Sequence, residues 1–162
     1  MLYIIDGYNV INASSIFFAN TLEGRRNKLF DFINSHRPHG SVNNDIIVVF
    51  DCNSKNPYES DGYNRENRGE IEVIFSDGKT IADDIIVQIA DDASNPYEII
   101  IVTNDKGIWH RTAPSGAKHE KSEDFIARGL KKGRQTENIE VCNDIKIEIN
   151  KELKNLWLSK QK

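Results

Sequence analysis

The sequence has no apolar run long enough to span a membrane and little that could form a disulfide or a zinc site. Its two cysteines, Cys52 and Cys142, lack CxxC spacing, which favours buried thiols in a reducing cytoplasm over a disulfide framework. The four histidines show no zinc-binding spacing. The start, MLYIID, reaches an aspartate too soon for a signal peptide. We therefore expect a cytoplasmic protein that does not insert into membranes.

Several common catalytic and nucleotide-binding motifs are also missing. There is no GxxxxGK[ST] phosphate loop, no GxGxxG dinucleotide motif and no GxSxG nucleophile elbow. What is present is an ordinary globular composition, with 38% hydrophobic and 28% charged residues in a chain of 162. This composition predicts one domain over residues 1–162. The apolar residues Leu153, Leu156 and Trp157 further predict a helical extension over 143–162.

The net charge of -4 conceals an uneven distribution. Residues 106–134 contain eight Lys or Arg against three acids, so this segment carries +5 and the remainder -9. An acidic remainder beside a basic segment suits a polyanionic ligand that must also meet a metal ion. The simpler alternative is a solvated helix with surface lysines.

Short apolar runs alternate with segments of helical spacing. Four runs predict buried strands at 2–6, 45–51, 71–75 and 98–103. Apolar spacing predicts helices over 21–36 and 80–93, and Ser122 is expected to cap another that runs to about residue 132. Irregular structure is expected over 53–69 and 107–121, and a last strand at 139–142. The alternation predicts an α/β fold with a mainly parallel sheet.

Aspartates occur where these elements begin or end. Asp6, Asp51 and Asp105 follow apolar runs, and Asp83 falls in the first turn of a predicted helix, where the helix dipole favours an anion. The carboxyl ends of parallel strands share one edge, so these side chains are expected to lie together. Asp84 is expected to be a solvated neighbour or a supporting group. Crowded carboxylates repel one another, and oxygen ligands favour Mg²⁺ or Mn²⁺.

Two polar motifs lie beside these aspartates: DGYN at 6–9 and TND at 103–105. Asn9 is expected to donate to Asp6 or to a phosphate, and Asn104 to hydrogen-bond a ligand or a carboxylate. Each motif also has a simpler interpretation. Asp6 could merely cap the next helix, and an Asn-Asp pair is common in turns.

The basic segment supplies candidates for contact with a polyanionic ligand such as a nucleic acid. Its cations would hold phosphates and give affinity that depends on salt but carries little sequence information: Lys106, Arg111, Lys118, Lys121 and Arg128. Trp109 could stack on a base of single-stranded RNA or pack in the core. Arg25 and Arg26 are expected on a solvated helix face, although either could reach the rim of the pocket.

The ordered segments LYIIDGYNVI, IIVVFD, KTIADDII and IIIVTNDKGIWH resemble the NYN domain, more narrowly its YacP-like branch within the PIN-like nuclease group. The resemblance covers roughly residues 1–134. It implies a three-layer α/β/α fold and a metal-dependent endoribonuclease. By motif, the catalytic and metal-binding set would be Asp6, Asp83 and Asp105, with Asn9 and Asp84 as supporting residues. Asp51 matches a strand end of the family whose role is less settled. Asn104, where the family more often has Ser, is a further supporting candidate.

The resemblance also implies a cytoplasmic bacterial setting, with single-stranded messenger RNA as the substrate and the ribosome as a candidate partner. No oligomeric state follows from it. Two other functions stay open. One is a non-catalytic RNA-binding module of the same fold. The other is a phosphatase or phosphotransfer protein with Asp6 or Asp51 as nucleophile, although the common aspartate type would need an acid where Tyr8 stands.

Overall fold

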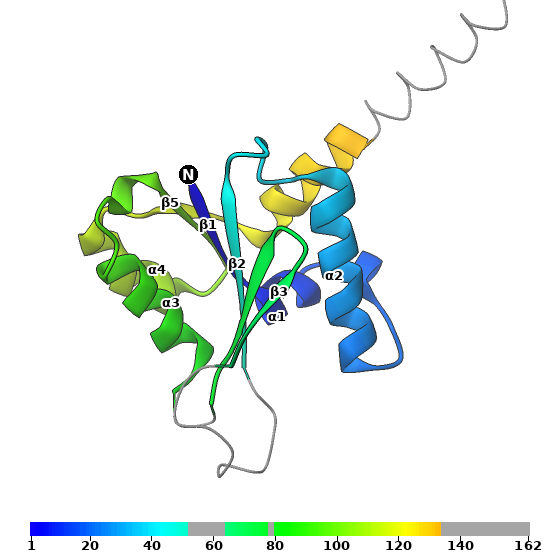
Figure 1. Ribbon diagram of the computed structural model, residues 1–162, viewed down its shortest axis with the longest axis horizontal. Helices are drawn as coiled ribbons and strands as arrows, with labels where there is room; N and C mark the ends of the chain where they lie inside the picture. Colours follow the sequence, from blue (N-terminus) through cyan, green and yellow to red (C-terminus); the bar gives the residue numbers. More distant parts are fainter. Residues whose placement is uncertain (52–63, 78–79, 134–162) are drawn as a thin grey trace, which may run out of the picture.

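The computed structural model describes residues 1–51, 64–77 and 80–133. They build a sheet of six strands, which lies at the centre of the fold (Figure 1). The strand order is β3-β4-β2-β1-β5-β6. The strands are β1 Leu2–Asp6, β2 Asp45–Phe50, β3 Asn64–Arg68, β4 Ile71–Phe75, β5 Ile99–Val102 and β6 Lys118–Glu120. All neighbours pair in parallel except β3, which runs antiparallel to β4. The predicted mainly parallel sheet is therefore confirmed.

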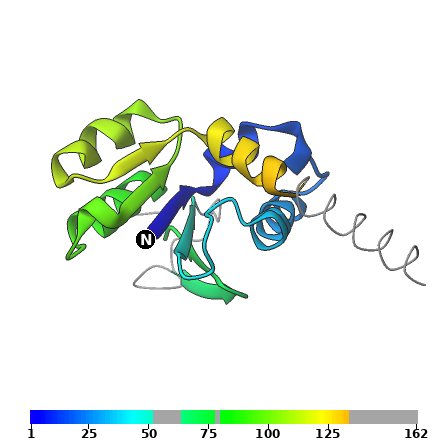
Figure 2. The same ribbon diagram turned by 90° about the horizontal axis from the view of Figure 1, so that it is seen from above.

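Helices cover both faces of this sheet (Figure 2). They are α1 Gly7–Asn12, α2 Leu22–His36, α3 Ala82–Asp91 and α4 Lys106–Thr112, and residues 122–133 are also helical. Single 3-10 turns lie at Ser15–Phe17, Pro96–Glu98 and Ala113–Ser115. The helices α1, α2 and 122–133 pack on one face, and α3 and α4 pack on the other. These three layers confirm the predicted α/β/α fold.

The central strand β1 shows why its sequence is a continuous apolar run. Tyr3 and Ile5 join the core under α1 and α2, whereas Ile4 joins the core under α3 and α4. Successive side chains of a strand point to opposite faces, so a strand covered on both sides must be apolar at every position. All three side chains are buried. The two cores thus fix the sheet from both sides.

The long helix α2 begins and ends close to the predicted bounds because both ends are capped. Thr21 accepts a hydrogen bond from the Gly24 amide at 3.0 Å. At the other end Arg37 adopts a left-handed conformation with φ 44°. Such a residue closes many helices.

Three expectations about local structure were wrong. Part of the expected irregular segment 53–69 is strand β3, and part of 107–121 is helix α4 and strand β6. Ser122 does not cap its helix. Its hydroxyl donates to Asn9, and the first helical carbonyl is that of Lys121, which accepts from Phe125.

Some expectations lie outside the described residues. These are the irregular segment up to residue 63, the strand at 139–142, the extension at 143–162 and both cysteines. Within the described ranges, no helix is long and apolar enough to cross a membrane.

Candidate active site at the carboxyl edge of the sheet

Asp6 ends β1 at the carboxyl edge of the sheet, beside Val49 of β2. Burial raises the pKa of its carboxyl group to about 6. Hydrogen bonds from the Asn9 amide and the Thr103 hydroxyl oppose this shift, while Asp83 and Asp51 add to it. Asp6 is therefore a carboxylate that is costly to ionise.

Asp83 extends the same electrostatic group from the first turn of α3. Burial raises its pKa, and the charges of Asp105 and Asp51 raise it further. The cation of Arg111 acts in the opposite direction. At the carboxyl edge of the sheet, the charges of Asp51 and Asp83 thus act on Asp6, and those of Asp51 and Asp105 act on Asp83.

The hydroxyl group of Thr103 links two of these aspartates. It donates to Asp6 Oδ2 at 2.9 Å and accepts from the Asp105 amide at 3.1 Å. Thr103 is completely buried. Asp105 in turn caps α4 by accepting from the Gly107 amide at 2.6 Å. Both carboxylates are therefore held in defined positions.

Asp6 also caps α1, because its Oδ1 accepts from the Asn9 amide at 3.2 Å. The simpler interpretation of the DGYN motif, that Asp6 caps the next helix, is therefore correct. The same carboxylate caps α1 and lies at the carboxyl edge of the sheet, so the two interpretations are compatible.

Asp51 has a structural task that the sequence does not reveal. The N-cap residue of α3, Ile81, makes no side-chain hydrogen bond. Asp51 Oδ1 instead accepts from the Ala82 amide at 2.7 Å and from the Ser76 hydroxyl at 3.4 Å. Asp51 therefore anchors the start of α3, one residue before Asp83.

The two asparagines hold the surrounding elements together. Asn9 Oδ1 accepts from the Asn104 amide and the Ser122 hydroxyl, both at 2.9 Å. Asn104 Oδ1 accepts from the Ser122 amide at 3.1 Å, and its Nδ2 donates to Glu123 at 2.9 Å. Asn9 donates to Asp6 as expected, but through its backbone amide, while its side-chain oxygen joins the residues that follow β5 to the helix at 122–133.

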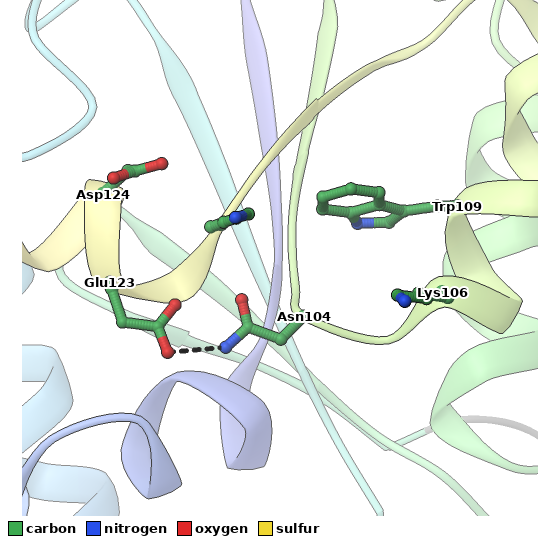
Figure 3. Close-up of a pocket in the computed structure, with 6 residues that line it drawn as sticks. Asn104, Lys106, Trp109, Glu123 and Asp124 are labelled. Atoms are coloured by element: carbon green, nitrogen blue, oxygen red, sulfur yellow. Dashed lines mark hydrogen bonds between the residues drawn. The ribbon is translucent and has the colours of Figure 1, made fainter.

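The structure brings together only part of the predicted RNA-binding set. Lys106, Trp109 and Lys121 line one surface pocket of about 440 Å³ with Asn104, Glu123 and Asp124 (Figure 3). Arg111 and Asp84, both about half exposed, form an ion pair at 2.7 Å on the neighbouring side of the edge.

The remaining two basic candidates lie elsewhere. Lys118 opens the edge strand β6 opposite Ile100. Arg128 pairs with Glu120 at 2.8 Å, and its guanidinium group lies 5.6 Å from the centre of the Tyr3 ring. Arg128 also donates to the Pro38 carbonyl, so it supports the fold away from the pocket.

Arg26 lies among aromatic rings at the carboxyl edge and not on a solvated helix face, which agrees with the alternative that it reaches the pocket rim. Its guanidinium group lies 5.3, 5.2 and 5.0 Å from the ring centres of Tyr8, Phe50 and Phe75, and it donates to the Tyr8 hydroxyl. Phe50 and Phe75 end β2 and β4. Aromatic residues at two strand ends were the signal that could have placed this cation at the carboxyl edge.

Carboxylate oxygens are the ligands that Mg²⁺ and Mn²⁺ prefer, so the aspartates fit such an ion in donor type. In the part of the chain that the structure describes, no three acidic, His or Cys side chains already converge on one point. Asp6, Asp51 and Asp105 each direct an oxygen at a backbone amide.

Comparison with known proteins agrees with this architecture. No curated protein sequence matches the chain. The crystal structure of Rae1 (YacP) from Bacillus subtilis is 23% identical with a TM-score of 0.65, over 99% of this chain and 89% of that one. The crystal structure of a mutant of the same protein is also 23% identical, with a TM-score of 0.66 over 85% of this chain and 79% of that one. These likenesses establish the fold. Residues 3–162 match the YacP-like NYN domain, and the chain therefore belongs to this PIN-like nuclease family.

Proposed function

We propose that the protein is a metal-dependent endoribonuclease that hydrolyses RNA phosphodiester bonds. The observation that carries this proposal is the placement of Asp6, Asp51, Asp83 and Asp105 at the carboxyl edge of a nuclease-family domain, where neighbouring carboxylates raise the pKa values of Asp6 and Asp83. Without a cation this arrangement is costly, because buried carboxylates favour the protonated form. We assign Asp6, Asp83 and Asp105 as the catalytic ligands, with Asp51 and Asp84 beside them.

A bound Mg²⁺ or Mn²⁺ would activate water for attack on phosphorus and offset the charge of the leaving oxygen. The chain's own residues prepare the positions of the ligands. Thr103 orients Asp6 through its hydroxyl, and Asp51 fixes the backbone next to Asp83. Asn9 and Asn104 hold the β5 end against the helix at 122–133.

The substrate that we propose is single-stranded RNA, and messenger RNA in the cytoplasm in particular. The family resemblance supports this setting and makes the ribosome a candidate partner. Lys106 and Lys121 beside the edge would attract phosphates without reading sequence.

Incubation with a mixed RNA pool and Mg²⁺, followed by end mapping, tests the proposal. We expect Asp6→Asn, Asp83→Asn and Asp105→Asn each to lower cleavage by at least about 100-fold, and we expect EDTA to have the same effect on the wild type. Asp92→Asn removes an exposed carboxylate just beyond the far end of the same helix α3 and should cleave normally. Undiminished cleavage by the three variants would refute the assignment.

The non-catalytic RNA-binding module is the second candidate, because no three ligands converge among the described residues. It predicts that the wild type binds RNA with the same affinity with or without EDTA and leaves it intact in Mg²⁺. Mapped cleavage products that disappear with EDTA exclude it.

A further inference from the structure

We propose that the pocket beside Trp109 is a subsite for one unpaired nucleobase next to the bond that is cut. This proposal rests on the proposed ribonuclease function. It assigns a binding role to the space between α4 and the helix at 122–133, where Figure 3 shows the side chains of Trp109 and Lys106 on one side and those of Glu123 and Asp124 on the other.

The pocket adjoins the carboxylate edge through Asn104. This residue lines the pocket, precedes Asp105 in the chain and donates its backbone amide to Asn9, two residues into α1. The volume of about 440 Å³ lies within the range of small-molecule sites. A nucleotide whose base enters here would therefore have its phosphate near the aspartates.

Trp109 is fixed in a way that leaves its ring free for stacking. Its only polar group, Nε1–H, donates to the Thr103 carbonyl at 3.1 Å. His119 packs near the ring with 5.5 Å between centroids. Trp109 is only partly buried and belongs to neither apolar core. The alternative of core packing therefore does not explain it, whereas bases stack on such held aromatic rings.

The charges around the ring suit a nucleotide. Neither Lys106 nor Lys121 forms an ion pair or hydrogen bond with the residues that the structure describes. Both amines are available for the phosphates that flank the base. Glu123 is held by Asn104, and the carboxylates of Glu123 and Asp124 could accept from base amino groups. In a duplex these groups are already paired, so the pocket selects an unpaired base.

Oligoribonucleotides with one abasic residue, placed at each position around a mapped cut, test this subsite. We expect one position to lower wild-type kcat/KM by about tenfold to a hundredfold, the range for loss of one stacked base. Trp109→Ala should show the same loss on unmodified RNA and no further loss on that abasic RNA. Trp109→Phe should keep most of the activity.

Phe18→Ala is the matched control, because it removes an exposed aromatic ring that lies outside the pocket. Phe18→Ala should leave kcat/KM unchanged both on unmodified RNA and on the abasic RNA. Thermal melts show whether Trp109→Ala is folded. If it is not, the rates of Trp109→Phe on unmodified and abasic RNA are compared with those of the wild type instead. Independent losses from the abasic residue and from the Trp109 substitution would overturn the proposal.

If no RNA is cleaved, the proposed function fails but the subsite is still measurable. Trp109 and Trp157 are the two tryptophans, so Trp157→Phe leaves Trp109 as the sole indole fluorophore. Quenching by a short single-stranded oligoribonucleotide, weakened when the same oligonucleotide is fully abasic, would support base stacking. Equal quenching by both, or none by either, would overturn it.

Discussion

At the scale of single residues, Asp6 makes stability depend on pH. Its pKa is about 6 in the folded protein against an ordinary value of 3.8, so between these pH values the folded state binds more protons than the unfolded state. Stability is therefore lost as pH rises from about 4 to above 6, by about 3 kcal/mol in total.

We expect Asp6→Asn to recover about 3 kcal/mol at pH 8 in EDTA and to lose most of that gain by pH 4. Urea denaturation at both pH values measures it, with Asp92→Asn as the control for simple removal of charge. Added Mg²⁺ should stabilise the wild type more than the variant. A gain that is equal at both pH values would contradict the role of ionisation.

Gly7 matters for stability because the packing around it leaves no room for a side chain. A Cβ atom at this position would lie 2.2 Å from the Phe50 ring, so the side chain is excluded by close packing. We expect Gly7→Ala to cost about 1–3 kcal/mol of unfolding free energy in urea titrations. Combining it with Phe50→Leu should cost less than the sum of the two, because the smaller side chain removes the clash. Strict additivity would count against this explanation.

At the scale of elements, Asp51 acts as the cap that α3 lacks within its own sequence. Asp51→Ala should destabilise the fold by about 1 kcal/mol, and Asp51→Asn by less because its amide oxygen can still accept. Cleavage should fall with Asp51→Ala, since the start of α3 also carries Asp83. Thermal melts and cleavage rates measure the two effects, and an Asp51→Asn variant as unstable as Asp51→Ala would show that the charge matters more.

The elements that could be predicted are those that bury an apolar stripe of their own. The helices α2 and α3 and the central strands were found because their apolar spacing reports burial directly. The strand β3, with sequence NRENR, has no apolar residue and exists because it pairs with β4. The helix α4 has seven residues, of which only Ile108 and Thr112 are buried, and depends on its Asp105 cap.

The candidate site also has a part that the sequence predicts and a part that it does not. The aspartate cluster was predictable, because parallel strands of similar length place their final residues at one edge. Its hydrogen-bond partners were not predictable, since the contact of Asn9 with Ser122 joins residues 113 positions apart. The aromatic surroundings of Arg26 were not predictable either, because its neighbouring rings come from three different elements.

At the scale of the whole molecule, the basic segment should govern affinity for RNA. Binding of single-stranded RNA to Asp83→Asn, which retains the lysines, should weaken as salt rises. Lys106→Ala and Lys121→Ala should each reduce the slope of log affinity against log salt by about 0.7. Lys28→Ala on α2, outside the Trp109 pocket, is the control. Unchanged slopes in a filter-binding or anisotropy titration would exclude these phosphate contacts.

The two outer strands of the sheet have a consequence for solubility. The inner parallel strands are rich in Ile and Val, a composition that would aggregate if another chain could add to the sheet. One border is β3, where Arg65 pairs with Glu72 at 2.8 Å and Arg68 with Glu66 at 3.0 Å. The other border is β6, only three residues long with sequence KHE. Short or charged borders disfavour further strand addition, so each domain can keep an apolar sheet without offering neighbouring chains a template.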